Sequence, residues 1–143
     1  MTFGATDAPL KAEQLEKDGL AQWPMVMGAI VPVVNIEGVK PGELVFDGET
    51  LAAVYLGKIT KWDDAAIKAL NSGVTLPSTP IVPVHRNDKS GTTKIFSSWL
   101  GKNVASDWTL PAEETLSWPV GQSAKGSDGV TGAVAGAKGG ITY

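Results

Sequence analysis

The sequence contains no cysteine and a single histidine, His85, in 143 residues. Without cysteine the chain has no disulfide, no thiol nucleophile and no thiolate ligand for a metal. One histidine also disfavours a histidine-based metal centre, because such centres bring several ligands together. The sequence therefore implies no metal and no other cofactor, and it disfavours the enzyme classes that depend on cysteine or on several histidines.

Positive charge and long apolar runs are scarce as well. The formal net charge is −3, whereas a nucleic-acid-binding domain usually carries a basic surface. The longest apolar stretch, residues 23–34, is interrupted by Pro24, Gly28 and Pro32. It is also shorter than the roughly 20 residues that a membrane helix needs. We expect neither a nucleic-acid partner nor a membrane span.

The composition that remains is that of one folded domain, with 43% hydrophobic and 19% charged residues. The first residues lack the basic and apolar segments of a signal peptide. The last five, Gly-Gly-Ile-Thr-Tyr, are typical of a turn that enters a strand. The two ends together suggest a piece of a longer protein.

Apolar segments and helix-start signals alternate along the chain. Helices are predicted over residues 11–20, 47–57, 65–70, 92–100 and 126–137. Strands are predicted over residues 23–36, 81–85, 118–121 and 139–143. This alternation indicates an α/β sheet rather than a β-sandwich.

Two finer predictions concern burial. The Val-, Ile- and Met-rich residues 23–36 are predicted to form a strand that is buried on both faces. In the helix over residues 92–100, Ile95, Phe96 and Trp99 are expected on the buried side. Core packing, rather than a stacking platform, is also the expected role of the five tryptophans: Trp23, Trp62, Trp99, Trp108 and Trp118.

The polar loop after the strand at residues 81–85 is the most informative segment. Ser90, Gly91 and Thr92 open a helix there, and the first N–H groups of a helix lack internal partners and suit an anion. The Arg86 guanidinium adds a fork of donors that matches two oxygens of a tetrahedral oxyanion. Asp88 follows two residues later and is placed to hold that guanidinium. This loop is a candidate anion site.

Simpler interpretations stay open for this loop and its neighbours. Ser90 serves equally well as an ordinary N-cap, with Arg86 and Asp88 as a surface ion pair. The loop lacks the Gly-x-x-x-x-Gly-Lys-Ser/Thr pattern of nucleotide-binding loops. Residues 125–129 suggest either a helix cap that faces a cleft or a second anion site.

Catalytic machinery is not evident. We expect His85 to be structural or exposed, and Glu113 and Glu114 to form a solvated pair rather than a glycosidase couple. The sequence shows no nucleophile with an activating base and no metal site. The prediction is a protein that is not an enzyme.

Several motifs in one order make the chain recognisable. They are Phe3-Gly4-Ala5-Thr6-Asp7-Ala8-Pro9-Leu10, Asp47-Gly48-x-Thr50-Leu51, Tyr55-Leu56-Gly57-Lys58-Ile59-x-Lys61-Trp62, Arg86-x-Asp88-x-Ser90-Gly91-Thr92, and Trp118-Pro119-Val120-Gly121 with Lys125-Gly126-x-Asp128-Gly129. With them, essentially the whole chain resembles the periplasmic phosphate-binding protein of bacterial phosphate ABC transporters.

The resemblance implies a fold and partners. The fold is one three-layer α/β/α lobe of a type II periplasmic binding protein, with a mixed, mostly parallel sheet. Residues 1–143 would form a single domain, the second lobe, with residues 1–22 as an inter-lobe segment and short helix and residues 23–143 as the lobe itself. The implied partners are inorganic phosphate and, for the full-length family, the permease of the phosphate transporter. The implied location is the periplasm.

The resemblance also implies roles for individual residues. Four would contact phosphate from this lobe: Arg86, Ser90, Gly91 and Thr92. Asp88 would orient Arg86. Asp7 would accept a hydrogen bond from a phosphate proton, which excludes sulfate because sulfate carries no proton near neutral pH.

The alternative to a phosphate-binding lobe is a dissected or engineered lobe that folds without retained phosphate binding. Its apolar cleft face would then lack a cover. Such a face favours a homodimer, either through the exposed cleft face or through exchanged terminal segments. A strand at residues 2–6 would be one such segment, because it would lack its own sheet.

Overall fold

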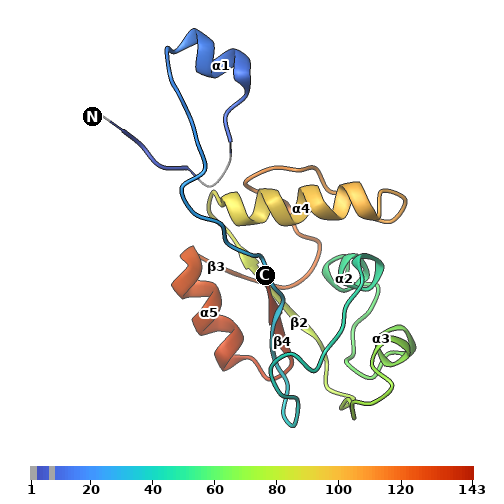
Figure 1. The fold of residues 1–143 in the computed structure, drawn as a ribbon. Helices are drawn as coiled ribbons and strands as arrows, with labels where there is room; N and C mark the ends of the chain where they lie inside the picture. Colours follow the sequence, from blue (N-terminus) through green and yellow to red (C-terminus); the bar gives the residue numbers. More distant parts are fainter. Residues whose placement is uncertain (1–2, 7–8) are drawn as a thin grey trace.

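The computed structural model describes residues 3–6 and 9–143. Its four-stranded sheet has the order β1-β4-β2-β3 (Figure 1). The strands are β1 (Val33–Asn35), β2 (Val82–Arg86), β3 (Gln122–Ala124) and β4 (Gly140–Thr142). The helices are α1 (Ala12–Lys17), α2 (Gly48–Tyr55), α3 (Ala65–Leu70), α4 (Gly91–Asn103) and α5 (Gly126–Gly136).

The sheet is mixed and mostly parallel, as expected. β1 runs antiparallel to β4, whereas β2 runs parallel to both β4 and β3. β2 is followed by α4 and β3 by α5. Because the two strands are parallel neighbours, their carboxyl ends lie at the same edge, and both helices begin at that edge.

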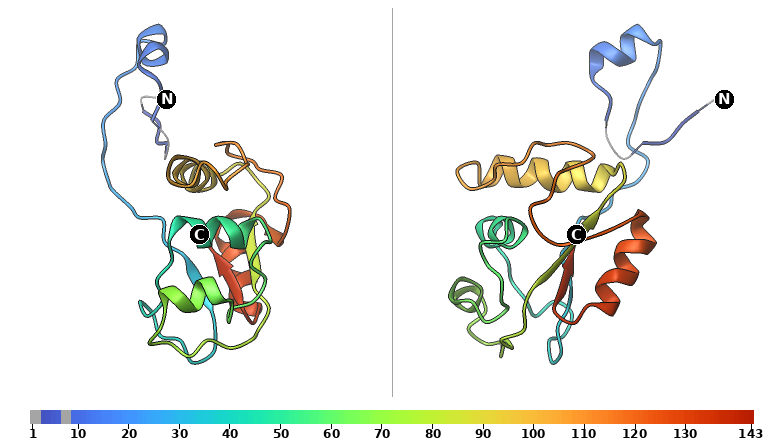
Figure 2. Two further views of the ribbon diagram at one scale, coloured as in Figure 1. Left: turned by 90° about the vertical axis from the view of Figure 1, so that its right-hand side faces the viewer. Right: turned by 180° about the vertical axis from the view of Figure 1, so that it is seen from behind.

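Helices cover both faces of the sheet, which gives three layers (Figure 2). On one face, Val130 and Val134 of α5 pack with Val84 of β2. The other face carries the larger core, where Tyr55 of α2, Leu100 of α4 and their neighbours pack with the sheet. The chain is therefore an α/β/α lobe.

Local signals in the sequence account for most helix boundaries. The Asp47 side chain accepts from the Thr50 N–H at 2.7 Å, and the Asp64 side chain accepts from the Ala66 N–H at 2.9 Å. These N-caps start α2 and α3 where they were predicted. Gly57 follows α2 with φ +73°, a conformation that glycine adopts readily.

The prediction for residues 23–36 is wrong. Only Val33–Asn35 form a strand, and residues 21–29 are exposed. The prolines at positions 24 and 32 cannot donate to a ladder. In addition, the apolar side chains of residues 23–29 are exposed and lack the neighbours that a doubly buried strand requires. Only Ile30, Val34 and Ile36 of this stretch reach the main core.

The strand expected at residues 118–121 begins later, at Gln122. Pro119 has no N–H to give to a ladder. Gly121 has φ +109°, and its Cα lies so close to β2 that a Cβ there would be 2.5 Å from the Pro83 carbonyl oxygen. The chain therefore turns at Gly121, and pairing with β2 starts after the turn.

α4 is longer than predicted, and its buried stripe is different. Thr93, Phe96, Ser97 and Leu100 are buried at helical spacing. Phe96 is thus confirmed as a core residue. Ile95 and Trp99 are 43% and 45% exposed. They are four positions apart and therefore share one face of the helix, which is not the buried face.

The expectation for the tryptophans holds only in part. Trp62 and Trp108 are buried, and Trp118 packs against the main core. Trp23 and Trp99 are exposed instead. Trp23 belongs to the N-terminal segment, residues 9–32, which leaves the packed body.

The N-terminal segment stands apart from the sheet, with α1 at its far end (Figures 1 and 2). α1 has no buried residue, and residues 3–6 form no strand. Large exposed apolar side chains gather in the N-terminal segment: Leu20, Trp23, Met25, Val26, Met27 and Val31. Within the described residues, no helix is both long enough and apolar enough to cross a membrane.

Candidate anion-binding site

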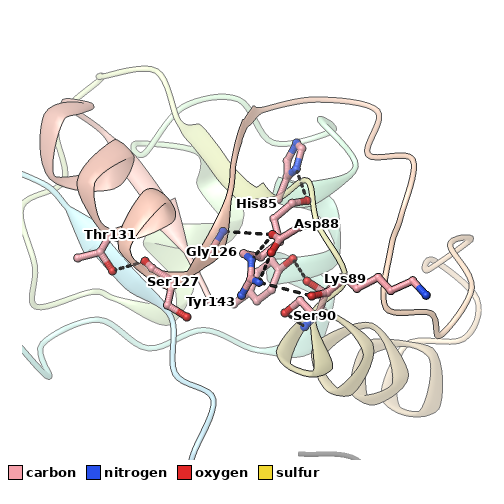
Figure 3. Close-up of polar contacts among 10 residues, drawn as sticks. His85, Asp88, Lys89, Ser90, Gly126, Ser127, Thr131 and Tyr143 are labelled. Atoms are coloured by element: carbon pink, nitrogen blue, oxygen red, sulfur yellow. Dashed lines mark hydrogen bonds and ion pairs between the residues drawn. The ribbon is translucent and has the colours of Figure 1, made fainter.

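The candidate site lies where β2 ends and α4 begins (Figure 3). Arg86, the last residue of β2, donates from Nε to Asp88 Oδ1 and from Nη2 to Asp88 Oδ2, both at 2.6 Å. Its Nη2 also reaches the Lys89 carbonyl oxygen at 3.5 Å. The two-point pairing fixes the plane of the guanidinium.

Asp88 joins this loop to the second helix start. Its Oδ1 accepts from the Gly126 N–H at 3.2 Å, at the beginning of α5. The Arg86 hydrogen bonds, and then the Gly126 N–H, hold the pKa of the Asp88 carboxyl far below its usual range. The same pairing raises the pKa of Arg86. The pair is therefore fully charged at neutral pH.

Ser90 is the N-cap of α4. Its Oγ accepts from the Thr93 N–H at 3.2 Å, and its side chain is almost fully buried. A hydroxyl that accepts one hydrogen bond still has its proton to donate. The backbone N–H of Ser90 is held by the Glu114 carbonyl oxygen at 3.0 Å. Ser90 is thus an ordinary N-cap, in agreement with the simpler interpretation. Its hydroxyl proton is still available to a ligand.

The next two residues carry free donors. Gly91 and Thr92 are the first two residues of α4, so their N–H groups have no partner within the helix. In the part of the chain that the structure describes, no other group accepts from them. Both residues are partly exposed. Two N–H groups at the positive end of a 13-residue helix are therefore open to a ligand.

On the β4 side, Tyr143 lies against the site. Its hydroxyl and Thr93 Oγ1 are 2.8 Å apart. Burial raises the pKa of Tyr143, while hydrogen bonding from Thr93 and from the Arg86 backbone, together with the Arg86 charge, opposes that rise. The tyrosine is therefore neutral at neutral pH, and its hydroxyl is a hydrogen-bonding group there.

His85 lies beside the site but faces the core. Its ring stacks on Trp118 with a centroid distance of 5.2 Å, and burial lowers the pKa of His85. The ring Nδ1 is 3.3 Å from the Arg86 carbonyl oxygen. His85 is a packed side chain, as expected.

The structure brings five of the predicted site residues together: Arg86, Asp88, Ser90, Gly91 and Thr92 share one loop and helix start. Asp7, the sixth, lies outside the described residues. Glu113 is exposed, while Glu114 is half-buried and contributes its backbone oxygen to the loop.

Three participants were missed: Thr93, Gly126 and Tyr143. The link from Asp88 to Gly126 spans 38 positions and the link from Thr93 to Tyr143 spans 50. No local pattern in the sequence announces contacts at such separations. For residues 125–129 the sequence left open a helix cap or a second anion site. Lys125 makes no side-chain cap, and the first N–H of α5 is already bound by the Asp88 carboxylate.

This arrangement is suited to holding a small oxyanion. It offers N–H and hydroxyl donors in the same loop as a fixed cation. Among the described residues, no group of three or more metal-ligating side chains gathers. A pocket of about 80 Å³ beside Gly139 lies at the start of β4, whereas the Arg86 loop lies at the end of β2.

Comparison with known proteins points the same way. The chain is 46% identical over 143 residues to the phosphate-binding protein PstS of Xylella fastidiosa and 45% identical to that of Pasteurella multocida. It covers 39% and 41% of those relatives, so it spans about two fifths of their length.

A solved structure gives the same relation. The high affinity periplasmic phosphate-binding protein PfluDING, bound with phosphate, aligns with 96% of this chain and 39% of its own chain. The TM-score is 0.61, at 29% sequence identity. The fold is thus that of one lobe of a type II periplasmic binding protein. The family model described as PBP superfamily domain matches residues 1–143, and the chain therefore belongs to the PBP superfamily.

Proposed function

We propose that this chain is a phosphate-binding lobe of a solute-binding protein, and that it holds inorganic phosphate at the start of α4 beside Arg86. One observation carries the proposal. The N–H groups of Gly91 and Thr92 have no partner within α4, and in the same loop Asp88 fixes the plane of the Arg86 guanidinium. The Ser90 hydroxyl adds a donor, and relatives that share the whole length of this chain are phosphate-binding proteins.

The wider setting is part of the same proposal. In a protein of the relatives' length, a second lobe would close on this one in the periplasm, and the complex would deliver phosphate to the permease of an ABC transporter. Residues 1–22 would form the inter-lobe segment, and residues 23–143 the lobe. Asp7 would accept the phosphate proton. The protein carries its ligand without transforming it.

Affinity for phosphate follows from what one lobe can supply. An open site leaves the anion partly in water, which weakens each charged hydrogen bond. We expect dissociation constants on the order of 1 mM, about 4 kcal/mol of binding free energy. A two-lobed clamp would gain more because it surrounds the anion.

A phosphate titration followed by NMR on the ¹⁵N-labelled chain tests the proposal. Saturable shifts should be concentrated at the amides of residues 90–93 and at Arg86. Arg86→Gln should abolish them. Lys89→Gln is the matched control, because it removes the same charge from the same loop while Lys89 extends its side chain away from Asp88 (Figure 3).

Each outcome is decisive. Shifts that never saturate, or that survive Arg86→Gln, would overturn phosphate binding at this loop and favour a lobe that folds without its ligand. Micromolar or tighter binding by a monomer would contradict the half-site account. The exposed apolar N-terminal segment supports the alternative of a homodimer, by face-to-face contact or exchanged termini, and light scattering during the titration would detect it.

A further inference from the structure

Tyr143 packs against three aromatic rings. It stacks on Phe96 of α4, with ring centroids 4.4 Å apart and planes at 13°. Tyr55 and Trp118 approach it at 5.7 and 5.8 Å. These three contacts restrict the orientation of the ring and therefore the position of its hydroxyl.

That hydroxyl meets the first turn of α4 in the candidate site. It is 2.8 Å from Oγ1 of Thr93, which is almost fully buried in the first turn of α4. Thr93 in turn donates its N–H to the Ser90 cap. Tyr143 itself directly follows β4, which pairs in parallel with β2. The phenol thus links the end of β4 to the first turn of α4.

We propose that Tyr143 is a positioning residue of this site, and that its hydroxyl ties the first turn of α4 to the end of β4, the strand that pairs with β2. The inference rests on the proposed function. Because β4 pairs with β2, the tie restricts movement of the free N–H groups of Gly91 and Thr92 relative to the Arg86 guanidinium. Donors that serve one small anion must be placed to within about 0.5 Å.

The two supports of the loop lie on opposite sides of β2. Asp88 holds Arg86 from the side of β3 and α5, through Gly126. Tyr143 follows β4, on the opposite side of β2 in the sheet order. Without Tyr143, the loop between β2 and α4 would be anchored from one side, by Asp88, and at Ser90 by the Glu114 backbone.

The test separates the hydroxyl from the ring. Tyr143→Phe keeps the stacking on Phe96 and removes the hydrogen bond. Thr93→Val removes the same hydrogen bond from the other side, whereas Thr93→Ser keeps the hydroxyl and therefore the hydrogen bond. Tyr55→Phe is the matched control, because Tyr55 lies in the same aromatic cluster and its buried hydroxyl has no partner among the described residues.

Phosphate affinity is the first measurement. Tyr143→Phe and Thr93→Val should each weaken binding about fivefold, the effect of one hydrogen bond. The double variant should be no weaker than either single one, since both remove the same interaction. Thr93→Ser and Tyr55→Phe should bind like the original chain. Unchanged binding by Tyr143→Phe, or independent effects that multiply in the double variant, would overturn the inference.

A second measurement needs no ligand. Hydrogen exchange of the Thr93 amide should speed up severalfold in Tyr143→Phe and Thr93→Val but stay unchanged in Thr93→Ser and Tyr55→Phe. Equal exchange in all four variants would refute the tie, whether or not phosphate binds. If the original chain fails to bind phosphate, the proposed function falls, and the exchange result alone decides the tie.

Discussion

Asp88 caps α5: its Oδ1 accepts the hydrogen bond of the Gly126 N–H at 3.2 Å. The residue before this helix, Lys125, makes no side-chain cap of its own. The same carboxylate holds the Arg86 guanidinium at two points. One side chain therefore satisfies a helix terminus and orients the cation beside the other helix start, so the geometry of the site depends on how β2 and α5 dock.

Asp88→Asn should lower the free energy of unfolding at pH 7, because it removes the charge that both Arg86 and Gly126 use. The folded-state pKa of Asp88 lies far below its usual range. Its contribution is therefore complete above the unfolded pKa of about 3.9 and is lost as the pH falls below that value. Urea unfolding at pH 7, 4 and 3 should show the two proteins converging toward low pH.

The control for this experiment is Asp128→Asn, which removes the same charge from the first turn of α5, where Asp128 is exposed. We expect a change within about 0.5 kcal/mol, as for most exposed positions. Parallel pH profiles for Asp88→Asn and the original chain would contradict the role given to Asp88.

Gly121→Ala should destabilise the fold by at least about 2 kcal/mol. Its φ of +109° costs an alanine about 1 to 3 kcal/mol. The new Cβ would also lie 2.5 Å from the Pro83 oxygen and 3.1 Å from His85 Cδ2. Chemical denaturation gives the difference in the free energy of unfolding.

Gly132→Ala in α5 serves as the comparison, since nothing lies within 4 Å of its added Cβ. Alanine is favoured over glycine inside a helix by about 1 kcal/mol, so this variant should be more stable than the original. Equal effects of the two substitutions would show that the turn at Gly121 is not constrained as described.

The predictability of this fold from its sequence follows the range of the interactions. Helix starts depend on neighbours two or three positions away, and Asp47 and Asp64 were identifiable for that reason. The Arg86 loop was likewise found because a strand, a cap and a cation follow one another directly. Links that cross the sheet, such as Asp88 to Gly126, leave no local pattern.

Apolar content misled the prediction where tertiary partners decide. Residues 23–32 have the composition of a buried strand, yet Met27 is 97% exposed. The composition of a segment shows how much apolar surface it could bury, but it does not show whether another element of the fold is there to cover that surface. Similarly, Trp99 is apolar but lies outside the stripe that Phe96 and Leu100 define on α4.

Stability should depend on pH near neutrality through His85. Burial lowers the pKa of His85 in the folded chain, so the unfolded state binds more protons between the folded pKa and about 6.5. This contribution is present above pH 6.5 and is lost as the pH falls. The slope is at most about 1.4 kcal/mol per pH unit for one proton.

Urea unfolding between pH 7.5 and 5.5 measures that slope. His85→Gln removes the chain's one imidazole, so its free energy of unfolding should be flatter across this range even if it is lower throughout. Asp88 does not interfere, because it titrates at much lower pH. The same slope in both proteins would show that another group is responsible.

The N-terminal segment should drive self-association. Its side chains at Met25, Val26 and Met27 are at least 80% exposed, and contiguous exposed apolar surface of this kind marks an interaction site. The double substitution Met25→Lys and Met27→Lys should shift the chain toward monomer in size-exclusion chromatography with light scattering. Because neither side chain packs on the body, the free energy of unfolding of the monomer should change by less than about 0.5 kcal/mol.

Ile95→Lys is the matched control for that association, since Ile95 is an exposed apolar residue on α4, outside the N-terminal segment. It should leave the molar mass profile unchanged. A chain that stays monomeric at high concentration before any substitution would contradict self-association. If the lysines instead destabilise the monomer, the segment must pack on the body in solution, which would place the apolar side chains of residues 20–31 in contact with the lobe.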